Sequence, residues 1–184
     1  MRKLTHAEIS RKRTPLASIN SVPRLPVSVI VDNIRSLYNV GSIFRSSDGV
    51  RLSKLILSGF TPKPPRKEIE KTALGSTLSV PWEYLRDPVE AVIAQKLAGH
   101  KVYCLELTDN TIPYYTINHG DFPLCLVIGN EITGVSKEVI ACCDHALEIP
   151  QHGIKQSLNV AVAYGIAIYH CSRVWRDFNS SEDQ

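Results

Sequence analysis

The sequence predicts an α/β fold built on an open, mostly parallel β-sheet. Short aliphatic and β-branched runs alternate with helical segments along most of the 184 residues, which is the order of repeated β-α-β units. The runs KVYCLEL and LCLVIG, which begin at Lys101 and Leu124, are apolar almost throughout. Central strands of a parallel sheet have this pattern because helices cover both of their faces. No internal repeat or interdomain linker interrupts the series, so we expect one domain.

The first half of the chain supplies two strands and two helices. VSVIVDNI is expected to be a buried strand from Val27, bounded by Pro26, and NVGSIFRSSDG a short helix from Asn39. KLILSG is the next strand. After a proline-rich loop, KEIEKTALG is expected to form a helix that ends at Gly75, since glycine commonly follows a helix C-terminus.

The second half repeats the pattern around the two central strands. PVEAVIAQKLAG has Pro88 in its first turn and Gly99 at its end, which marks a helix clearly. SKEVIACCD is expected to be a helix and HALEI a strand. The segment IPQHGIKQSLNVAVAYGIAIYH (Ile149–His170) leads into a final helix that is apolar on every face. Such a helix must be covered along its whole length.

The charges are unevenly distributed, although the net charge is only +3. We divide the chain into a basic N-terminal arm (1–26), a domain (27–176) and a flexible tail (177–184). The basic residues of the arm, opposed only by Glu8, are Arg2, Lys3, Arg11, Lys12, Arg13 and Arg24. A second basic group, diluted by Glu68 and Glu70, consists of Lys63, Arg66, Lys67 and Lys71. Both groups suit a phosphate backbone, and both also suit a solvated surface that binds nothing.

Several classes of protein are disfavoured. No stretch reaches the roughly 20 apolar residues of a membrane span, and the N-terminus lacks a secretory signal pattern, so a cytoplasmic location without membrane contact is expected. The five cysteines form no CxxC pair, and we expect reduced, mostly buried thiols and no metal site. No G-x-G-x-x-G follows a strand. GNEITGVS has the spacing of a P-loop, but Val135 occupies the position of the essential lysine.

Ligands of open parallel sheets bind beyond the carboxyl ends of the strands. Three motifs lie at such ends: NIRSLYNVGSIFRSSDGV, LVIGNEITGVS and EIPQHGIKQSLNVAVAYG. In this order and spacing they resemble the three motifs of the SpoU/TrmH branch of the SPOUT RNA methyltransferases, and the resemblance covers Val27 to Tyr169. It implies transfer of a methyl group from S-adenosylmethionine to a ribose 2′-hydroxyl of tRNA or rRNA. It also implies a Rossmann-like sheet with a C-terminal deep trefoil knot, and a homodimer.

The resemblance assigns catalytic positions to five residues: Arg45, Asn39, Glu131, Ser157 and Asn159. Three of them, Arg45, Glu131 and Ser157, have a plainer alternative where the residues are taken alone. Arg45 suits a surface salt bridge, with Asn39 at the opposite end of a short helix. Glu131 suits the N-terminus of a helix, where the dipole favours a carboxylate, and Ser157 suits the cap of the final helix. If the resemblance holds, Arg45 binds the developing oxyanion and an adjacent phosphate, which helps to take up the proton.

The cofactor requires an apolar slot for its adenine and backbone hydrogen-bonding groups. The positions that the resemblance assigns to it are Leu107, Gly129, Ile149, Ser157 and Leu158. Gly129 would let the chain approach the cofactor closely because glycine has no Cβ. Gln151 and His152 replace a methionine-containing loop of relatives and are candidates for setting which RNA is accepted.

Only about 26 residues precede the first expected strand, so either the basic arm or the catalytic dimer itself must bind RNA. We favour tRNA over rRNA as the substrate. Three alternatives stay open: a non-catalytic RNA-binding protein of the same fold, a base methyltransferase of another SPOUT branch, and a small-molecule methyltransferase. Intact Arg45, Ser157 and Asn159 argue against the first, and the basic arm argues against the last.

Overall fold

A single sheet organises the chain. The computed structural model describes residues 1–11 and 15–182. Seven strands lie in the order β3-β2-β1-β6-β4-β7-β5, and every pair of neighbours is parallel. The strands are β1 (Leu25–Asp32), β2 (Leu52–Ser58), β3 (Trp82–Leu85), β4 (Lys101–Leu105), β5 (Thr111–Pro113), β6 (Leu124–Ile128) and β7 (His145–Glu148). The predicted open, parallel α/β sheet is confirmed.

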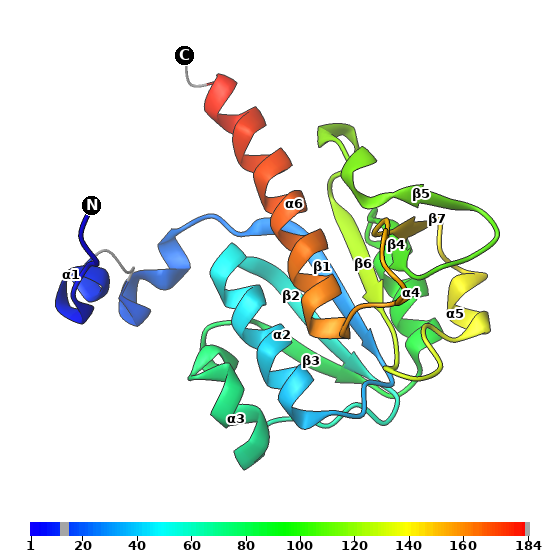
Figure 1. Ribbon diagram of the computed structural model, residues 1–184, viewed down its shortest axis with the longest axis horizontal. Helices are drawn as coiled ribbons and strands as arrows, with labels where there is room; N and C mark the ends of the chain where they lie inside the picture. The colour runs from blue at the N-terminus through cyan, green and yellow to red at the C-terminus, as the bar shows by residue number, and fades with distance from the viewer. Residues whose placement is uncertain (12–14, 183–184) are drawn as a thin grey trace.

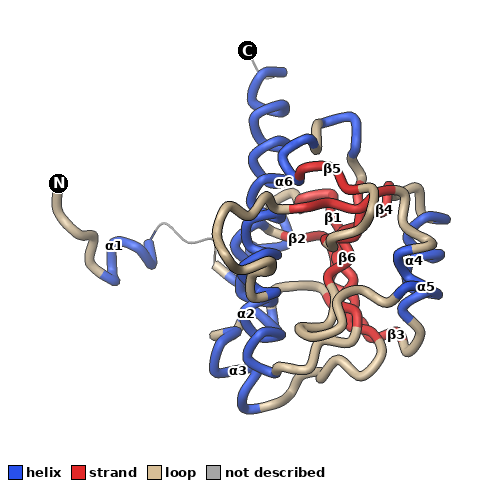
Figure 2. The backbone as a smooth tube through the Cα atoms, turned by 45° about the vertical axis from the view of Figure 1, so that its right-hand side comes forward, coloured by secondary structure: helices blue, strands red, loops and turns tan. Residues whose placement is uncertain are grey.

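Helices cover both faces of the sheet, as Figures 1 and 2 show. One layer contains α2, α3 and α6, and the other contains α4 and α5. The helices are α1 (His6–Arg11), α2 (Leu37–Val50), α3 (Lys67–Ala73), α4 (Pro88–Leu97), α5 (Lys137–Ile140) and α6 (Val160–Glu182). Short 3₁₀ turns span Leu16–Ser21, Ser76–Leu78, Tyr114–Thr116 and His119–Asp121.

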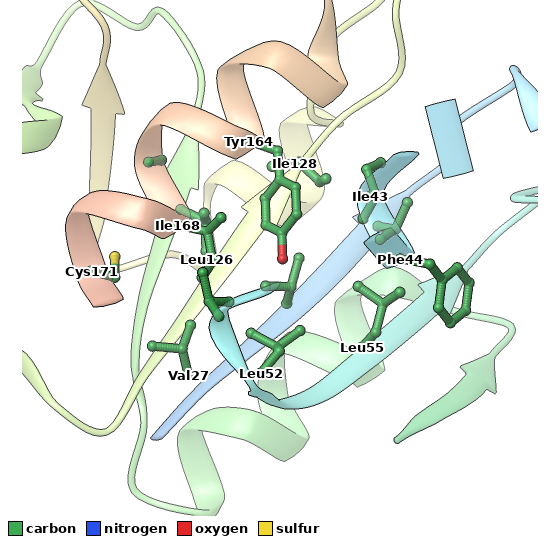
Figure 3. Close-up of a cluster of buried hydrophobic side chains, with 14 of the residues drawn as sticks. Val27, Ile43, Phe44, Leu52, Leu55, Leu126, Ile128, Tyr164, Ile168 and Cys171 are labelled. Carbon is green, nitrogen blue, oxygen red and sulfur yellow. The ribbon is translucent and has the colours of Figure 1, made fainter. Parts of the chain in front are cut away.

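The larger core lies under α2 and α6. Figure 3 shows Tyr164, Ile168 and Cys171 of α6 in one cluster with sheet residues such as Leu126, and Phe44 of α2 at the opposite side of this cluster. All five side chains are completely buried. Removing one such aliphatic or aromatic side chain from water stabilises a fold by about 1.5–3 kcal/mol. The C-terminal helix is therefore a principal part of the core.

A buried pair of hydroxyls joins the two helices of this layer. Ser47 Oγ lies 2.7 Å from Tyr164 Oη and donates or accepts there, and it also lies 2.7 Å from the Ile43 carbonyl oxygen. Burial raises the pKa of Tyr164, so its hydroxyl stays protonated and can donate. Because a buried hydroxyl without a partner is costly, this pair fixes how α6 sits against α2.

The ends of several elements differ from the sequence predictions. β1 begins at Leu25, and Pro26 lies inside it at an irregularity in the register with β2, where proline is tolerated. The strand ends at Asp32 because Asn33 adopts a left-handed conformation, with φ of 56°. β3 and β5 were not predicted; both lie at sheet edges and are too short to show an apolar run. α5 is shorter than the predicted helix and stops at Ile140.

The C-terminal segment also departs from expectation. Residues 150–159 are not helical, and α6 begins only at Val160. Its buried face matches the prediction, whereas Val162 and Tyr169 are half exposed, so within one chain the helix is not covered all round. α6 continues to Glu182, where we had expected a flexible tail from residue 177. The rest of that tail, 183–184, lies outside the described residues.

The N-terminal arm contains the short helix α1. Arg2 is bound by Glu8 at 2.5 Å. Arg24 donates to the carbonyl oxygens of Leu52 and Ser79, so it belongs to the domain surface. Lys12 and Arg13 lie outside the described residues. Two of the arm's predicted RNA-binding cations therefore already have partners in the protein.

Candidate active site

A cavity of about 500 Å³ lies beyond the carboxyl ends of β4, β6 and β7, beside the start of α6. Its volume is within the range of small-molecule sites. The apolar side chains that line it include Leu105, Ile128, Leu147, Val160 and Ala163. The polar side chains that line it include Glu106, Asn130, Glu131, Glu148, Gln151, Gln156 and Asn159. The sheet rule that selected these loops from the sequence thus locates the cavity correctly.

All five residues predicted to bind the cofactor line this cavity: Leu107, Gly129, Ile149, Ser157 and Leu158. They come from the ends of β4, β6 and β7 and from the segment before α6. Leu107 and Leu158 are 55% and 37% exposed, so apolar surface is available to a ligand. An apolar slot bordered by backbone suits the adenosine part of S-adenosylmethionine.

Glu131 occupies the N-terminal end of α2. Its carboxylate accepts hydrogen bonds from the backbone amides of Arg35 and Ser36, at 2.9 and 3.0 Å, and from Asn39 Nδ2 at 2.8 Å. Burial alone would raise the pKa of Glu131, but these hydrogen bonds together lower it. A negative charge is also favoured near the first turn of a helix. Glu131 therefore lies at a helix N-terminus, although that helix comes from far earlier in the chain.

Asn159 extends this network to the third motif. Its Nδ2 donates to Asn39 Oδ1 at 3.2 Å, so Asn39 connects Glu131 with Asn159. Asn159 Oδ1 also accepts from the Ala161 amide at 2.9 Å and caps α6. The prediction of a Ser157 cap is wrong, because the helix begins after Asn159 and Ser157 lies exposed in the preceding segment. Residues from all three motifs meet here.

Arg45 lies in the middle of α2, and the prediction that it and Asn39 occupy opposite ends of a helix is wrong. Its side chain is exposed and does not line the cavity. Within the described part of the chain, the guanidinium has no hydrogen bond or ion pair, so the surface salt bridge that we considered is not formed. Tyr38 and Ser42 share its face of the helix, at spacings of seven and three residues.

Gly129 is required by a contact inside the protein. A Cβ at this position would lie 2.2 Å from the Val135 amide nitrogen and 2.3 Å from the Gly134 carbonyl carbon. The chain turns back on itself here, with reciprocal backbone hydrogen bonds between Asn130 and Gly134. The expectation that this glycine serves close approach of the cofactor therefore misses its internal role.

Three polar residues that we did not assign from the sequence shape the same loop. Asn130 donates to the Asn33 carbonyl oxygen at 2.7 Å and accepts from the Ile132 amide at 2.8 Å. Glu106 accepts from the Val135 amide at 2.9 Å, and buried Asp32 accepts from the Ser136 amide at 3.1 Å. Asparagine or aspartate at the end of a buried strand, or within two residues of it, is a turn-forming signal that could have drawn attention to Asp32 and Asn130.

The cysteines and possible metal ligands are reported for the described residues alone. All five cysteines are free thiols; three are buried, while Cys142 and Cys143 are partly exposed. No group of three or more His, Cys, Asp or Glu side chains in the described ranges could hold a metal ion. No helix there is long and apolar enough to cross a membrane.

Comparison with known proteins identifies the family. The SpoU rRNA Methylase family matches residues 26–169. The tRNA (guanosine(18)-2′-O)-methyltransferase of Aquifex aeolicus is 32% identical over 79% of this chain and 68% of its own length. The Escherichia coli K12 enzyme of the same name is 29% identical over 80% of this chain. The chain spans only 63% of that relative.

Solved structures give the same result. The A. aeolicus TrmH/SpoU tRNA modifying enzyme superposes with a TM-score of 0.80 at 28% identity, covering 95% of this chain and 85% of that one. An AdoMet-bound rRNA methyltransferase from Sinorhizobium meliloti has a TM-score of 0.75 at 28% identity, covering 84% of this chain and 59% of that one.

These matches cover the three motifs, the sheet and the cavity together. They confirm the predicted family, with its RNA 2′-O-methyltransferase class and its S-adenosylmethionine cofactor. The chain belongs to the SpoU methylase family.

Proposed function

We propose that this chain transfers a methyl group from S-adenosylmethionine to a ribose 2′-hydroxyl of tRNA. The observation that carries the proposal is the hydrogen-bonded series Glu131–Asn39–Asn159, which brings the three motifs together at the rim of a ligand-sized cavity. tRNA is favoured over rRNA because several relatives, including those of A. aeolicus and E. coli, are named as tRNA enzymes. A Bacillus subtilis relative is named as a 23S rRNA 2′-O-methyltransferase, so rRNA is the alternative substrate.

The cavity residues fit this cofactor. The backbone at Leu107, Gly129, Ile149 and Leu158 would border the adenosine, and Ser157 would face the donor end. When bound, the cofactor supplies a sulfonium-activated methyl group. The apolar residues of the lining would keep water away from that group, which reduces competing hydrolysis and strengthens nearby electrostatic interactions.

Arg45 would act on the incoming ribose. A 2′-hydroxyl is a weak acid, so its attack needs the proton removed or the resulting alkoxide stabilised. Arginine is effectively never deprotonated in proteins, which makes it unsuitable as the base. Its fixed charge and five donors suit the developing oxyanion and the neighbouring phosphate, with that phosphate taking up the proton. The lack of a protein partner for Arg45 among the described residues leaves its donors available.

Glu131, Asn39 and Asn159 would position the reacting groups. Glu131 holds the start of α2, Asn39 relays that position to Asn159, and Asn159 fixes the start of α6. Correct placement of reactants accounts for a large part of enzymatic rate enhancement, so small displacements of these elements would slow transfer.

The test is single-turnover methylation of unmodified tRNA transcripts by wild type, Arg45→Ala and Arg45→Lys. We expect Arg45→Ala to be slower by about 100-fold or more, as for loss of an oxyanion donor, and Arg45→Lys to recover part of the rate. Binding of S-adenosylmethionine, measured by calorimetry, should be unchanged in both variants. Wild-type rates in Arg45→Ala, with unchanged RNA binding, would refute this role.

Nuclease digestion and mass spectrometry of the product identify the reaction itself. A 2′-O-methyl ribose is expected. A methylated base would assign the chain to base modification, and RNA binding without any product would make it a non-catalytic binding protein.

We further propose the knotted topology, the homodimer and the cytoplasmic location that the resemblance implies. The strand order supports a threaded path, because β7 lies beyond β4 whereas α6 returns to the side of β1 and α2. Val162 and Tyr169, both about half exposed on α6, offer an apolar surface to a second copy. Analytical ultracentrifugation tests the dimer, and a monomer at micromolar concentration would contradict it.

A further inference from the structure

We infer that the substrate RNA is held as an unpaired segment on a basic and aromatic surface beside the active site. This β2–α3 surface consists of Tyr38, Phe60, Lys63, Arg66, Lys67 and Lys71. It comes from the first turn of α2, the loop after β2, and helix α3 (Figure 1). The inference rests on the proposed function and specifies where its substrate lies.

The loop after β2 is fixed directly to the active-site backbone. The Phe60 amide donates to Asn33 Oδ1 at 3.0 Å, and the Ile34 amide donates to Thr61 Oγ1 at 3.0 Å. The next residue, Arg35, donates its own amide hydrogen to Glu131. An RNA segment on this loop would therefore be held in a constant position relative to the Glu131–Asn39–Asn159 series.

Helix α3 is held equally close to α2. Thr72 Oγ1 donates to the Tyr38 carbonyl oxygen at 3.0 Å. A Cβ on Gly41 would lie 2.1 Å from that same hydroxyl, so the two helices touch at a glycine. Lys71 Nζ lies 5.9 Å from the centre of the Tyr38 ring. The cations of α3 thus share one surface with the start of α2.

This surface carries positive charge that the protein does not neutralise. Lys63, Arg66, Lys67 and Lys71 are all exposed, and none forms an ion pair with any residue that the structure describes. The two nearby carboxylates, Glu68 and Glu70, oppose two of these four positive charges, so the surface stays positive on balance. Such a cluster attracts a polyanion such as RNA, and binding releases the counterions condensed on the RNA phosphates.

Exposed aromatic rings favour single-stranded RNA over duplex RNA as the ligand of this surface. The Phe60 side chain is 62% exposed and Tyr38 is 50% exposed, whereas most large apolar side chains on the sheet-facing sides of the helices are buried. Unpaired bases stack on such rings, while the bases of a duplex are already stacked on each other. Tyr38, Ser42 and Arg45 follow one face of α2, so a segment stacked on Tyr38 continues toward Arg45.

The experiment measures binding of a fluorescein-labelled oligouridine and of an unmodified tRNA transcript by the full chain, at several salt concentrations. The stacking variant is Phe60→Ala, with Leu97→Ala as its control, because Leu97 is an exposed apolar residue at the end of α4. The charge variant is Lys67→Ala, with Lys137→Ala as its control. Both lysines are exposed, and each is the first residue of a helix with glutamate after it.

We expect Phe60→Ala to weaken binding of both RNAs by about 5- to 100-fold without changing the salt dependence. Lys67→Ala should weaken binding and lower the slope of log affinity against log salt by about one. Both controls should match wild type, and all four variants should bind S-adenosylmethionine as wild type does. Thermal unfolding establishes that the variants are folded.

The surface is refuted if Phe60→Ala and Lys67→Ala bind both RNAs as wild type does, or if the wild-type chain binds neither RNA. The two proposals can fail separately. If neither variant impairs methylation or RNA binding, the proposed function stands and the proposed RNA-binding surface is contradicted. If RNA binding depends on Phe60 and Lys67 but no 2′-O-methylated product forms, the surface stands and the proposed function is contradicted.

Discussion

Two walls of the same cavity are built in opposite ways. The wall around Glu131 is dense with hydrogen bonds: Glu131 accepts three, and Asn130 ties its loop to the end of β1. The second wall comes from the segment 150–158, of which Gln151, Gln156, Ser157 and Leu158 line the cavity. This segment is exposed along most of its length. Its single hydrogen bond to a described residue runs from Gln151 Nε2 to the Ile149 carbonyl oxygen. The first wall is organised before any ligand arrives, whereas the second has little to hold one conformation and would gain order from its ligand.

The largest effect is expected from breaking the organised wall at Glu131. Glu131→Gln keeps the size of the side chain but removes the charge at the start of α2 and substitutes a donor for one acceptor oxygen. We expect kcat/KM for tRNA methylation to fall by about 100-fold, which corresponds to about 2.7 kcal/mol. Glu138→Gln, at an exposed glutamate of α5, is the matched control and should be unchanged. Equal rates for the two variants would show that Glu131 does not position the site.

The two walls also differ in how they should tolerate a methyl group. Gly129→Ala would drive its Cβ into the backbone of Gly134 and Val135, and we expect a loss of about 2–3 kcal/mol in unfolding free energy. Gly153→Ala should change stability by less than about 0.5 kcal/mol, because nothing lies within 4 Å of the added Cβ. Urea unfolding of both variants measures the contrast. Equal losses would contradict the difference between the walls.

A smaller effect separates the two candidates for the cap of α6. Asn159→Ala removes the bond to the Ala161 amide and the bond to Asn39, and should cost about 1 kcal/mol of stability. Ser157→Ala, in the exposed wall, should cost less than about 0.5 kcal/mol. Thermal unfolding distinguishes them. A larger loss of stability for Ser157→Ala than for Asn159→Ala would support Ser157 as the cap of α6, as the sequence had indicated.

The smallest expected effect concerns pH. Hydrogen bonds lower the pKa of Glu131 below its ordinary value of 4.5 in the folded chain, against the opposing effect of burial. The stability that this provides is fully present above pH 4.5 and is lost as pH falls through the lowered folded-state pKa. The stability difference between wild type and Glu131→Gln should therefore be constant near neutral pH and shrink in acid. A stability difference that grows in acid would show that folding raises the pKa of Glu131 instead of lowering it.

The strands and the site were predictable to different degrees. β1, β2, β4 and β6 consist mostly of aliphatic and other apolar residues, because both faces of a central parallel strand are covered by helices. β7 was predicted from the shorter segment HALEI. β3 and β5 carry no such mark, since an edge strand of three or four residues depends on its neighbour.

Side-chain partners were harder to predict than strands. Asn39 and Glu131 are 92 residues apart in sequence, and their bond follows from the placement of β1 beside β6 rather than from either motif alone. The start of α6 was misplaced because SLN offers two capping residues, and only the tertiary contact with Asn39 selects between them.

The place of α6 in the core has a consequence for biosynthesis. The ribosome makes the β2–α3 surface before α6, yet Tyr164, Ile168 and Cys171 complete the layer that covers β1 and α2. Asn159 and the second cavity wall likewise follow β7 in the sequence. A nascent chain that has not yet reached α6 would therefore carry the basic surface without a complete cofactor cavity, and competence for methyl transfer would arise only after α6 has been made.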